Sequence, residues 1–204
     1  MKDAQVAEPF AGLRGLPVAE RLLAVSVRLF AEQGFESTSV QEIVAAAGVT
    51  KGAMYHYFAS KDDLLYEIYH RLLSLQTERL NTLADGPGDA AGRVRAVAED
   101  VVETTLGSID EAIVFFRSMH MLPADKRAQV RAERRRYHER FRALVEEGQR
   151  EGVFRADVSA DIVTHYFYGA VNHLGTWYHR DGGLSPRQVA EHYADLLLGG
   201  LIKN

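Results

Sequence analysis

The sequence contains no cysteine, only five prolines and no long apolar run. Without cysteine, the chain can form neither disulfides nor thiolate metal sites, and it has no cysteine nucleophile. No apolar stretch reaches the roughly 18 residues that a membrane span requires, and the first residues lack the basic and then apolar pattern of a signal peptide. We therefore expect a soluble cytoplasmic protein with no cofactor, no metal site and no membrane partner.

Positive charge is not in excess either. The chain has 24 Lys and Arg against 28 Asp and Glu, which gives a formal net charge of −4. This balance is not typical of a nucleic-acid-binding protein. Net charge is a poor test, however, when only one small face contacts DNA, because the acidic residues can lie elsewhere. The charge therefore counts mildly against DNA binding without excluding it.

Apolar residues at helical spacing, separated by glycine and proline, predict an all-α fold of about nine helices. Residues 1–16 lack this periodicity and predict a flexible N-terminal arm. The Asp-Gly-Pro-Gly-Asp run at 85–89 is the clearest break between modules. The expected helices span residues 17–33, 39–48, 50–58, 60–84, 90–107, 110–122, 125–151, 159–180 and 186–202.

Residues 39–58, SVQEIVAAAGVTKGAMYHYF, have the features of two short helices joined by a tight turn. Ser39 and Glu42 fit a capping box, Gly48 permits a left-handed backbone in the turn, and Thr50 can cap the second helix. The polar and small side chains left exposed on that helix suit the major groove of DNA. The apolar positions would form a small core with the first helix of the chain: Val40, Ile43, Val44, Val49, Met54 and Phe58.

The stretch AAGVTKGAMYHYF, followed by Ala-Ser-Lys, closely resembles the TetR-type helix-turn-helix. The resemblance covers about residues 17–65. It implies a DNA-binding head over residues 17–62, with the motif at 39–58, and a ligand-binding and dimerisation body over residues 63–204. It also implies a homodimeric transcriptional repressor that binds double-stranded operator DNA in the cytoplasm, at the nucleoid, and responds to a small-molecule effector.

The resemblance assigns DNA contacts to three groups of residues. Gln41 would reach a base or a phosphate, and residues 50–53 at the start of the second helix would enter the groove. Tyr55, His56 and Lys61 would contact the phosphate backbone. Tyr55 or Tyr57 could instead cover the small core, and His56 could be an ordinary solvated residue. The implied DNA-binding residues are Gln41, Thr50, Lys51, Gly52, Ala53, Tyr55, His56 and Lys61.

Residues 162–178 are apolar on nearly every side, which indicates a helix buried on two faces, one against a partner subunit and one against a cavity. With a second apolar stripe over 189–201, they predict a four-helix dimer interface. Each polar or aromatic group among these apolar neighbours could contact the effector or be an ordinary core or interface residue. The candidates are Arg117, His120, Tyr166, Asn172, His173 and Trp177.

Seven arginines between residues 127 and 142 form a basic stripe. A solvated face paired with glutamates is the ordinary interpretation, and a rim for a phosphate-bearing ligand is the sharper one. The tail, from EGVFRAD at 151–157 to LGGL at 198–201, resembles the acyl-CoA-responsive branch of the TetR family. That resemblance implies a CoA thioester from fatty-acid or sterol catabolism. A hydrophobic acid, an aromatic compound or a drug-like molecule is the alternative effector.

Two other functions have less support in the sequence. There is no nucleophile motif and no glycine-rich phosphate loop, so we do not expect an enzyme. His165, His173 and His179 are spaced too widely along one helix to bind a single metal ion. A ligand-binding protein whose helix-turn-helix has lost its DNA affinity remains an alternative, because the N-terminal third has little positive charge. The sign of the effector's influence on DNA binding also stays open.

Overall fold

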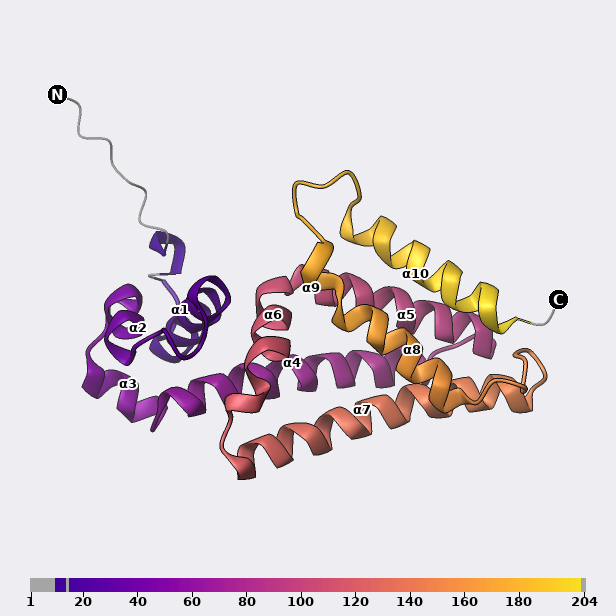
Figure 1. Ribbon diagram of the computed structural model, residues 1–204, viewed down its shortest axis with the longest axis horizontal. Coiled ribbons are helices and arrows are strands. Elements are labelled where there is room, and N and C mark those ends of the chain that lie inside the picture. Colours follow the sequence, from indigo (N-terminus) through magenta and orange to yellow (C-terminus); the bar gives the residue numbers. More distant parts are fainter. Residues whose placement is uncertain (1–9, 14, 203–204) are drawn as a thin grey trace.

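The computed structural model describes residues 10–13 and 15–202, and helices dominate that part of the chain (Figure 1). Strand pairing there is limited to one isolated bridge between Phe154 and Ile202, so the predicted all-α fold is confirmed. In chain order the helices are η1 (Ala11–Leu13), α1 (Val18–Gln33), α2 (Val40–Ala47), α3 (Lys51–Tyr57), α4 (Lys61–Ala84), α5 (Ala90–Gly107), α6 (Ile109–Ser118), η2 (Met119–Met121), α7 (Ala124–Arg150), α8 (Ala160–Asn172), α9 (Leu174–Trp177) and α10 (Pro186–Leu201).

Most helix boundaries follow from local chemistry. Ser39 caps α2 by accepting a hydrogen bond from the Glu42 amide at 3.2 Å, and the Glu42 carboxylate accepts one from the Ser39 amide at 2.7 Å. One boundary does not: the single helix expected over 159–180 ends at Asn172, and a four-residue α9 follows. At Gly175 an added Cβ would lie 3.0 Å from Ile113 of α6. Close packing on α6 therefore accompanies the break.

The buried side chains form two apolar clusters. The head cluster joins α1, α2, α3 and the first half of α4 with parts of α6 and α7. The body cluster joins α5, α7, α8, α9 and α10 with the end of α4. Helix α4, with 24 residues, is about 36 Å long and belongs to both clusters. Figure 1 shows it running from α3 into the centre of the body.

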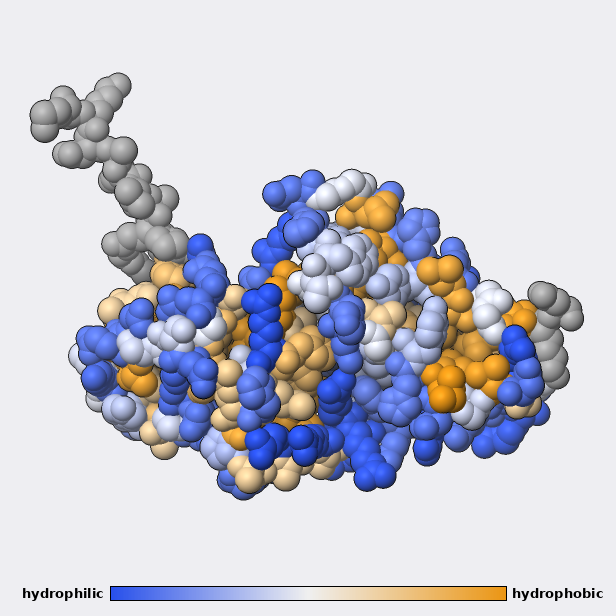
Figure 2. Space-filling view, viewed as in Figure 1, coloured by the Kyte–Doolittle hydropathy of each residue, from blue (hydrophilic) through white to orange (hydrophobic). Residues whose placement is uncertain are grey.

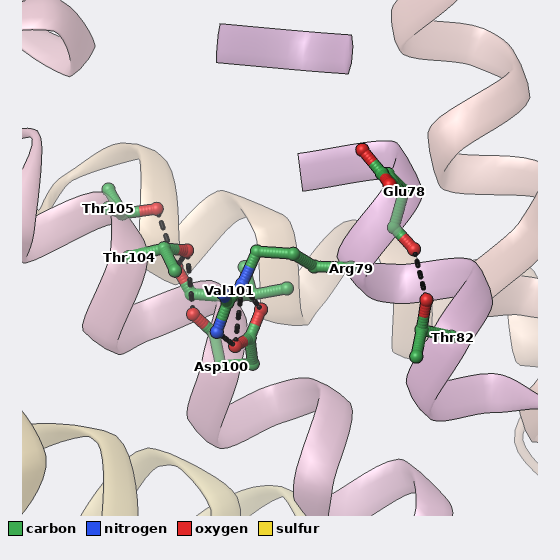
Figure 3. A network of polar contacts seen from close by, with 7 residues as sticks. All are labelled: Glu78, Arg79, Thr82, Asp100, Val101, Thr104 and Thr105. Carbon is green, nitrogen blue, oxygen red and sulfur yellow. Dashed lines mark hydrogen bonds and ion pairs between the residues drawn. The ribbon is translucent and has the colours of Figure 1, made fainter. Parts of the chain in front are cut away.

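Polar contacts hold α4 against α5 (Figure 3). The Arg79 guanidinium donates from Nε to both carboxylate oxygens of Asp100, at 2.9 and 3.0 Å. The hydroxyls of Thr104 and Thr105 donate back into their own helix, to the carbonyls of Asp100 and Val101, each at 2.6 Å. The hydroxyl hydrogens of both threonines are therefore used within α5.

Much of the expected N-terminal arm, residues 1–9 and 14, lies outside the described residues. Of the remainder, residues 11–13 form the turn η1, and the side chains of Phe10 and Leu13 pack against the head cluster. The Arg28 guanidinium lies 5.0 Å from the centre of the Phe10 ring. Across the described residues, no helix combines the length and the apolar character that a bilayer crossing needs.

Candidate DNA-binding and effector sites

The turn between α2 and α3 is built as the sequence predicts. Gly48 ends α2 with φ 63° and ψ 40°, the left-handed conformation that glycine adopts without a steric penalty. Thr50 then caps α3, since its hydroxyl oxygen accepts a hydrogen bond from the Ala53 amide at 3.1 Å. Ile43 of α2 and Met54 of α3 are fully buried beneath the turn. These contacts fix α3 on the head with one side toward solvent.

The outer side of α3 carries most of the predicted DNA-binding residues. Gln41, Thr50, Lys51, Gly52, Tyr55 and His56 are exposed, and Ala53 is half-buried. Tyr57 is 51% exposed and meets His56 edge-on at 5.0 Å, so it does not cover the head core. The structure thus leaves these residues open to solvent, most of them on α3 and Gln41 on the neighbouring α2.

Gly52 lies at the start of this surface and has open space around it. An added Cβ would meet only the Thr50 hydroxyl oxygen, at 3.8 Å, which is ordinary contact. Glycine within a helix is less favourable than alanine by about 1 kcal/mol. The fold itself therefore gives no reason for glycine at this position. A partner that must approach the backbone closely, such as DNA, does give one.

Lys61 has a different environment from the other seven. Its ammonium donates to the carbonyls of Phe35 at 2.6 Å and Thr38 at 2.8 Å, and it lies 4.2 Å from the centre of the Phe35 ring. Burial lowers the pKa of this ammonium below its ordinary value. Two of its three hydrogens are used within the head. These contacts favour a structural role in holding the α1–α2 connection over the phosphate contact expected from the sequence.

The body contains a narrow chamber with mostly apolar walls. The space between its walls is about 450 Å³, including the open solvent at its mouth. Five helices line it: α4 with Leu72, Leu73 and Gln76, α5 with Val101 and Thr105, α6 with Ala112, Phe115 and Phe116, α7 with Arg134, Tyr137 and His138, and α8 with Tyr168, Val171 and Asn172. A mainly apolar cavity with a few polar groups is the usual form of a small-molecule site.

A second hollow, the arginine groove, adjoins the chamber and lies between α7 and α8. It is lined by Met119, Arg131, Arg134, Arg135, His138, Glu139, Arg142, Asp161, Thr164 and His165. Figure 2 shows hydrophilic side chains gathered between α6 and α8, above the first half of α7. Arg134 and His138 line both hollows, so the two hollows border each other at these side chains, which we call the passage residues.

Arg134 is a half-buried cation without a carboxylate partner. Among the described residues, no acid lies within ion-pair distance of Arg131 or Arg134, whereas Arg135 pairs with Glu139 at 3.1 Å. The Arg134 guanidinium instead lies 5.7 and 5.8 Å from the ring centres of Phe115 and Phe116. Burial lowers its pKa, so its charge is held at a cost in solvation.

His138 stacks flat on Tyr168, with ring centres 4.1 Å apart and planes 4° from parallel. Burial, with the nearby charges of Arg134 and His165, lowers the pKa of His138 to about 4. The imidazole is therefore neutral at physiological pH. The positive charge of the passage residues comes from the arginine alone.

Of the six effector-binding candidates from the sequence, the structure places only Asn172 in the chamber wall. Arg117, His120 and His173 are exposed, Tyr166 is 65% exposed and Trp177 is 45% exposed. Helix α8 is apolar on nearly every side, and its pattern could not show which side faces inward. The inward side proves to carry Val163, Phe167, Tyr168 and Val171.

Sequence reasoning also missed the polar residues that do line the chamber: Gln76, Arg134, Tyr137, His138 and Tyr168. The basic stripe on α7 did indicate the groove, but no local pattern distinguished Arg134 from its neighbours. Arg134 differs from them by its neighbours in space, Phe115 and Phe116 of α6.

The chamber and the head are joined through α6. The hydroxyl of Tyr69, on α4, donates to the carbonyl of Val114 at 2.9 Å, and its ring meets Phe115 edge-on at 4.8 Å. Tyr69 is fully buried in the head cluster, and Phe115 also lines the chamber. A chain of contacts therefore links the chamber wall to α4, which begins close to the end of α3.

An apolar face remains uncovered on α8 and α10. Ile162 and Tyr166 of α8 are 60% and 65% exposed, and Leu196 of α10 is 70% exposed. Figure 2 shows apolar side chains over both helices. Large exposed apolar patches on a monomer mark interaction surfaces.

In the described part of the chain, no three metal-binding side chains come together.

Comparison with known proteins gives matches over most of the chain. The family model described as "Bacterial regulatory proteins, tetR family" matches residues 22–68, and "Tetracyclin repressor-like, C-terminal domain" matches residues 87–201. The HTH-type transcriptional repressor KstR2 of Mycobacterium tuberculosis is 25% identical over 183 residues, which cover 89% of this chain and 92% of that repressor.

Two solved structures are similar in fold and sequence. The TetR family transcriptional regulator PfmR from Thermus thermophilus has a TM-score of 0.83 at 30% identity, covering 90% of this chain and 100% of PfmR. AibR, solved in complex with isovaleryl coenzyme A and operator DNA, has a TM-score of 0.79 at 26% identity, covering 89% of this chain and 98% of AibR.

Proposed function

The chain belongs to the TetR family and is a DNA-binding regulator of transcription, and from this premise we propose that it is a homodimeric repressor released from its operator by a CoA thioester. Its site of action would be the cytoplasmic nucleoid. The relatives are regulators rather than enzymes, and we infer no catalytic activity for this chain.

The observation that carries the effector assignment is that the chamber and the arginine groove lie side by side and share Arg134 and His138 in their walls. An acyl group needs an apolar enclosure, and the phosphates of CoA need cationic groups at its mouth. Arg134 stands where the two meet and has no carboxylate partner in the described residues. A phosphate or thioester oxygen would supply the missing partner. That AibR was solved with isovaleryl coenzyme A supports the same class of effector.

A free hydrophobic acid is the second candidate, because a carboxylate could also pair with Arg134. It would leave Arg131 and the rest of the groove without a role. The groove therefore favours the thioester. The two candidates differ in an observable way, since only the thioester should depend on arginines beyond the passage residues.

Dimerisation would use the uncovered apolar face of α8 and α10. Two such helices from each subunit would make a four-helix interface and would set the distance between the two heads. Replacing Leu196 and Ile162 with glutamate should yield monomers, because each charge would be buried at the interface. Light scattering at several concentrations would detect the change. Glutamate at Leu75, which is 51% exposed on α4, is the matched control.

The effector is tested by thermal shift and calorimetry with acyl-CoAs of several lengths, the matching free acids and free CoA. At 100 times its Kd, a ligand should stabilise the protein by about 2.7 kcal/mol. We expect Arg131→Gln and Arg134→Gln each to weaken thioester binding by about tenfold, with Arg136→Gln as the control on the far side of α7. Free acids that bind as tightly as their thioesters would refute the assignment.

A further inference from the structure

Two tyrosines in the chamber wall have hydroxyl groups for which the protein provides no hydrogen-bond partner of normal geometry. Tyr137 of α7 and Tyr168 of α8 are each only 3% exposed, and their ring centres are 5.2 Å apart. Both hydroxyl oxygens are closed off from solvent and unpartnered. An unsatisfied buried hydroxyl costs about 1–3 kcal/mol, and native proteins rarely keep one without a use.

The pair cannot satisfy itself. Two hydroxyls carry two hydrogens, and if one donates to the other oxygen, the second hydrogen still lacks an acceptor. Burial raises the pKa of both phenols, so both keep their hydrogens at neutral pH. One hydrogen-bond donor is therefore always left over.

The neighbouring polar groups do not take up this donor. The Thr105 hydroxyl donates to the Val101 carbonyl at 2.6 Å and lies 3.4 Å from the Gln76 amide nitrogen. His138 lies flat on the ring of Tyr168 and so faces its π surface. The adjoining wall at Val101 and Val171 is apolar. The chamber itself is the remaining place for an acceptor.

We propose that the acyl group of the effector carries an oxygen acceptor, such as a ketone, a hydroxyl or a ring ether, which accepts a hydrogen bond from the Tyr137–Tyr168 pair. This inference rests on the proposed function, because it takes the chamber as the acyl site. A plain saturated chain would leave the donor unpaired. The pair thus selects oxygenated acyl groups over plain ones.

The test compares thioesters matched in size, hexanoyl-CoA with 5-oxohexanoyl-CoA and cyclohexanecarbonyl-CoA with its 4-oxo analogue. Calorimetry on the wild type should give tighter binding of the oxygenated member in at least one pair, by about tenfold or more. In Tyr137→Phe/Tyr168→Phe that preference should fall to nearly one. Tyr178→Phe, outside the chamber wall, should keep it. Equal binding of both members in the wild type, or a preference that survives in the double variant, would overturn the inference.

A second measurement needs no effector. If the hydroxyls have no partner beyond each other, the double Phe variant should melt close to or above the wild-type temperature, because it loses two buried polar groups and at most the bond between them. A fall of several degrees would reveal a structural partner, such as a buried water, and would contradict the inference. Failure of every thioester to bind would refute the proposed effector class, and the inference with it. Binding without preference would refute the inference alone.

Discussion

The head and the body differ in how deeply they bury the residues assigned to function. In the head, Lys51, Gly52 and Tyr55 stand on the outer side of α3, and the core beneath is complete without them. In the body, Tyr137 and Tyr168 belong both to the chamber wall and to the body cluster. Substitutions on the outer side of α3 should therefore cost little stability. Substitutions in the chamber wall that change the effector should also disturb the packing of the body core.

Substitutions at two glycines, one in the head and one in the body, should show this difference most clearly. We expect Gly52→Leu in the head to reduce operator affinity by about 100-fold, or about 2.7 kcal/mol, because the new side chain would keep the α3 backbone from the groove. Its melting temperature should stay at or above the wild-type value. Fluorescence anisotropy with an operator selected from random duplexes measures the affinity. Gly107→Leu, exposed at the end of α5, is the matched control, and a comparable loss there would contradict this role for Gly52.

Gly148 in the body should behave in the opposite way. An added Cβ would overlap the ring of Phe154 and lie 3.1 Å from the Ala90 side chain. We expect Gly148→Ala to lower the free energy of unfolding by about 2 kcal/mol, as overpacked cores do, without a direct effect on DNA contacts. Urea unfolding measures the loss. Unchanged stability would mean that the Gly148–Phe154 packing is looser than described.

His138 predicts a pH effect that belongs to the body. Its pKa is lowered from 6.5 to about 4 in the folded state, so the unfolded chain takes up the proton first as the pH falls. Stability should therefore decrease from about pH 6.5 down to pH 4, by about 1–2 kcal/mol between pH 7 and pH 5 from this group. Unfolding of the wild type and His138→Gln at both pH values isolates the effect. Equal pH dependence in the two proteins would contradict it.

The smallest effect expected separates the two lysines of the head. Lys61→Met should lower the stability by about 1 kcal/mol, because its charged hydrogen bonds to Phe35 and Thr38 are lost, and should leave the salt dependence of operator binding unchanged. Lys51→Gln should keep the stability and reduce the salt slope by about one, as loss of a phosphate contact does. If Lys61→Met also reduced the salt slope of operator binding, Lys61 would contact a phosphate, and the purely structural role would be contradicted.

The parts of the fold that local chemistry controls could be predicted from the sequence. The capping box at Ser39, the left-handed Gly48 and the cap at Thr50 each follow from residues within four positions of one another. Buried Ile43, Val44, Met54 and Phe58 confirm the predicted head core. The DNA-binding candidates were predicted from the same short stretch, and all but Ala53 and Lys61 are exposed.

The chamber proposed as the effector site could not be predicted in this way, because residues distant in sequence create it. Asn172 lines the chamber, whereas Tyr166 and Trp177, which have the same apolar surroundings in the sequence, are exposed and lie outside its wall. The break before α9 coincides with close packing on Ile113, more than 60 residues away. Periodicity describes the faces of one helix, and only the neighbouring helices decide what each face meets.

The central claim is that one molecule bound in the chamber and groove changes the affinity of the head for operator DNA. The direct measurement is operator affinity by anisotropy with and without a saturating acyl-CoA, in the wild type and in Arg134→Gln. We expect the thioester to weaken operator binding by about 5- to 150-fold, the usual range of allosteric coupling, and Arg134→Gln to shift this release to higher thioester concentrations. An operator affinity that stays the same while the thioester is bound would contradict this mechanism.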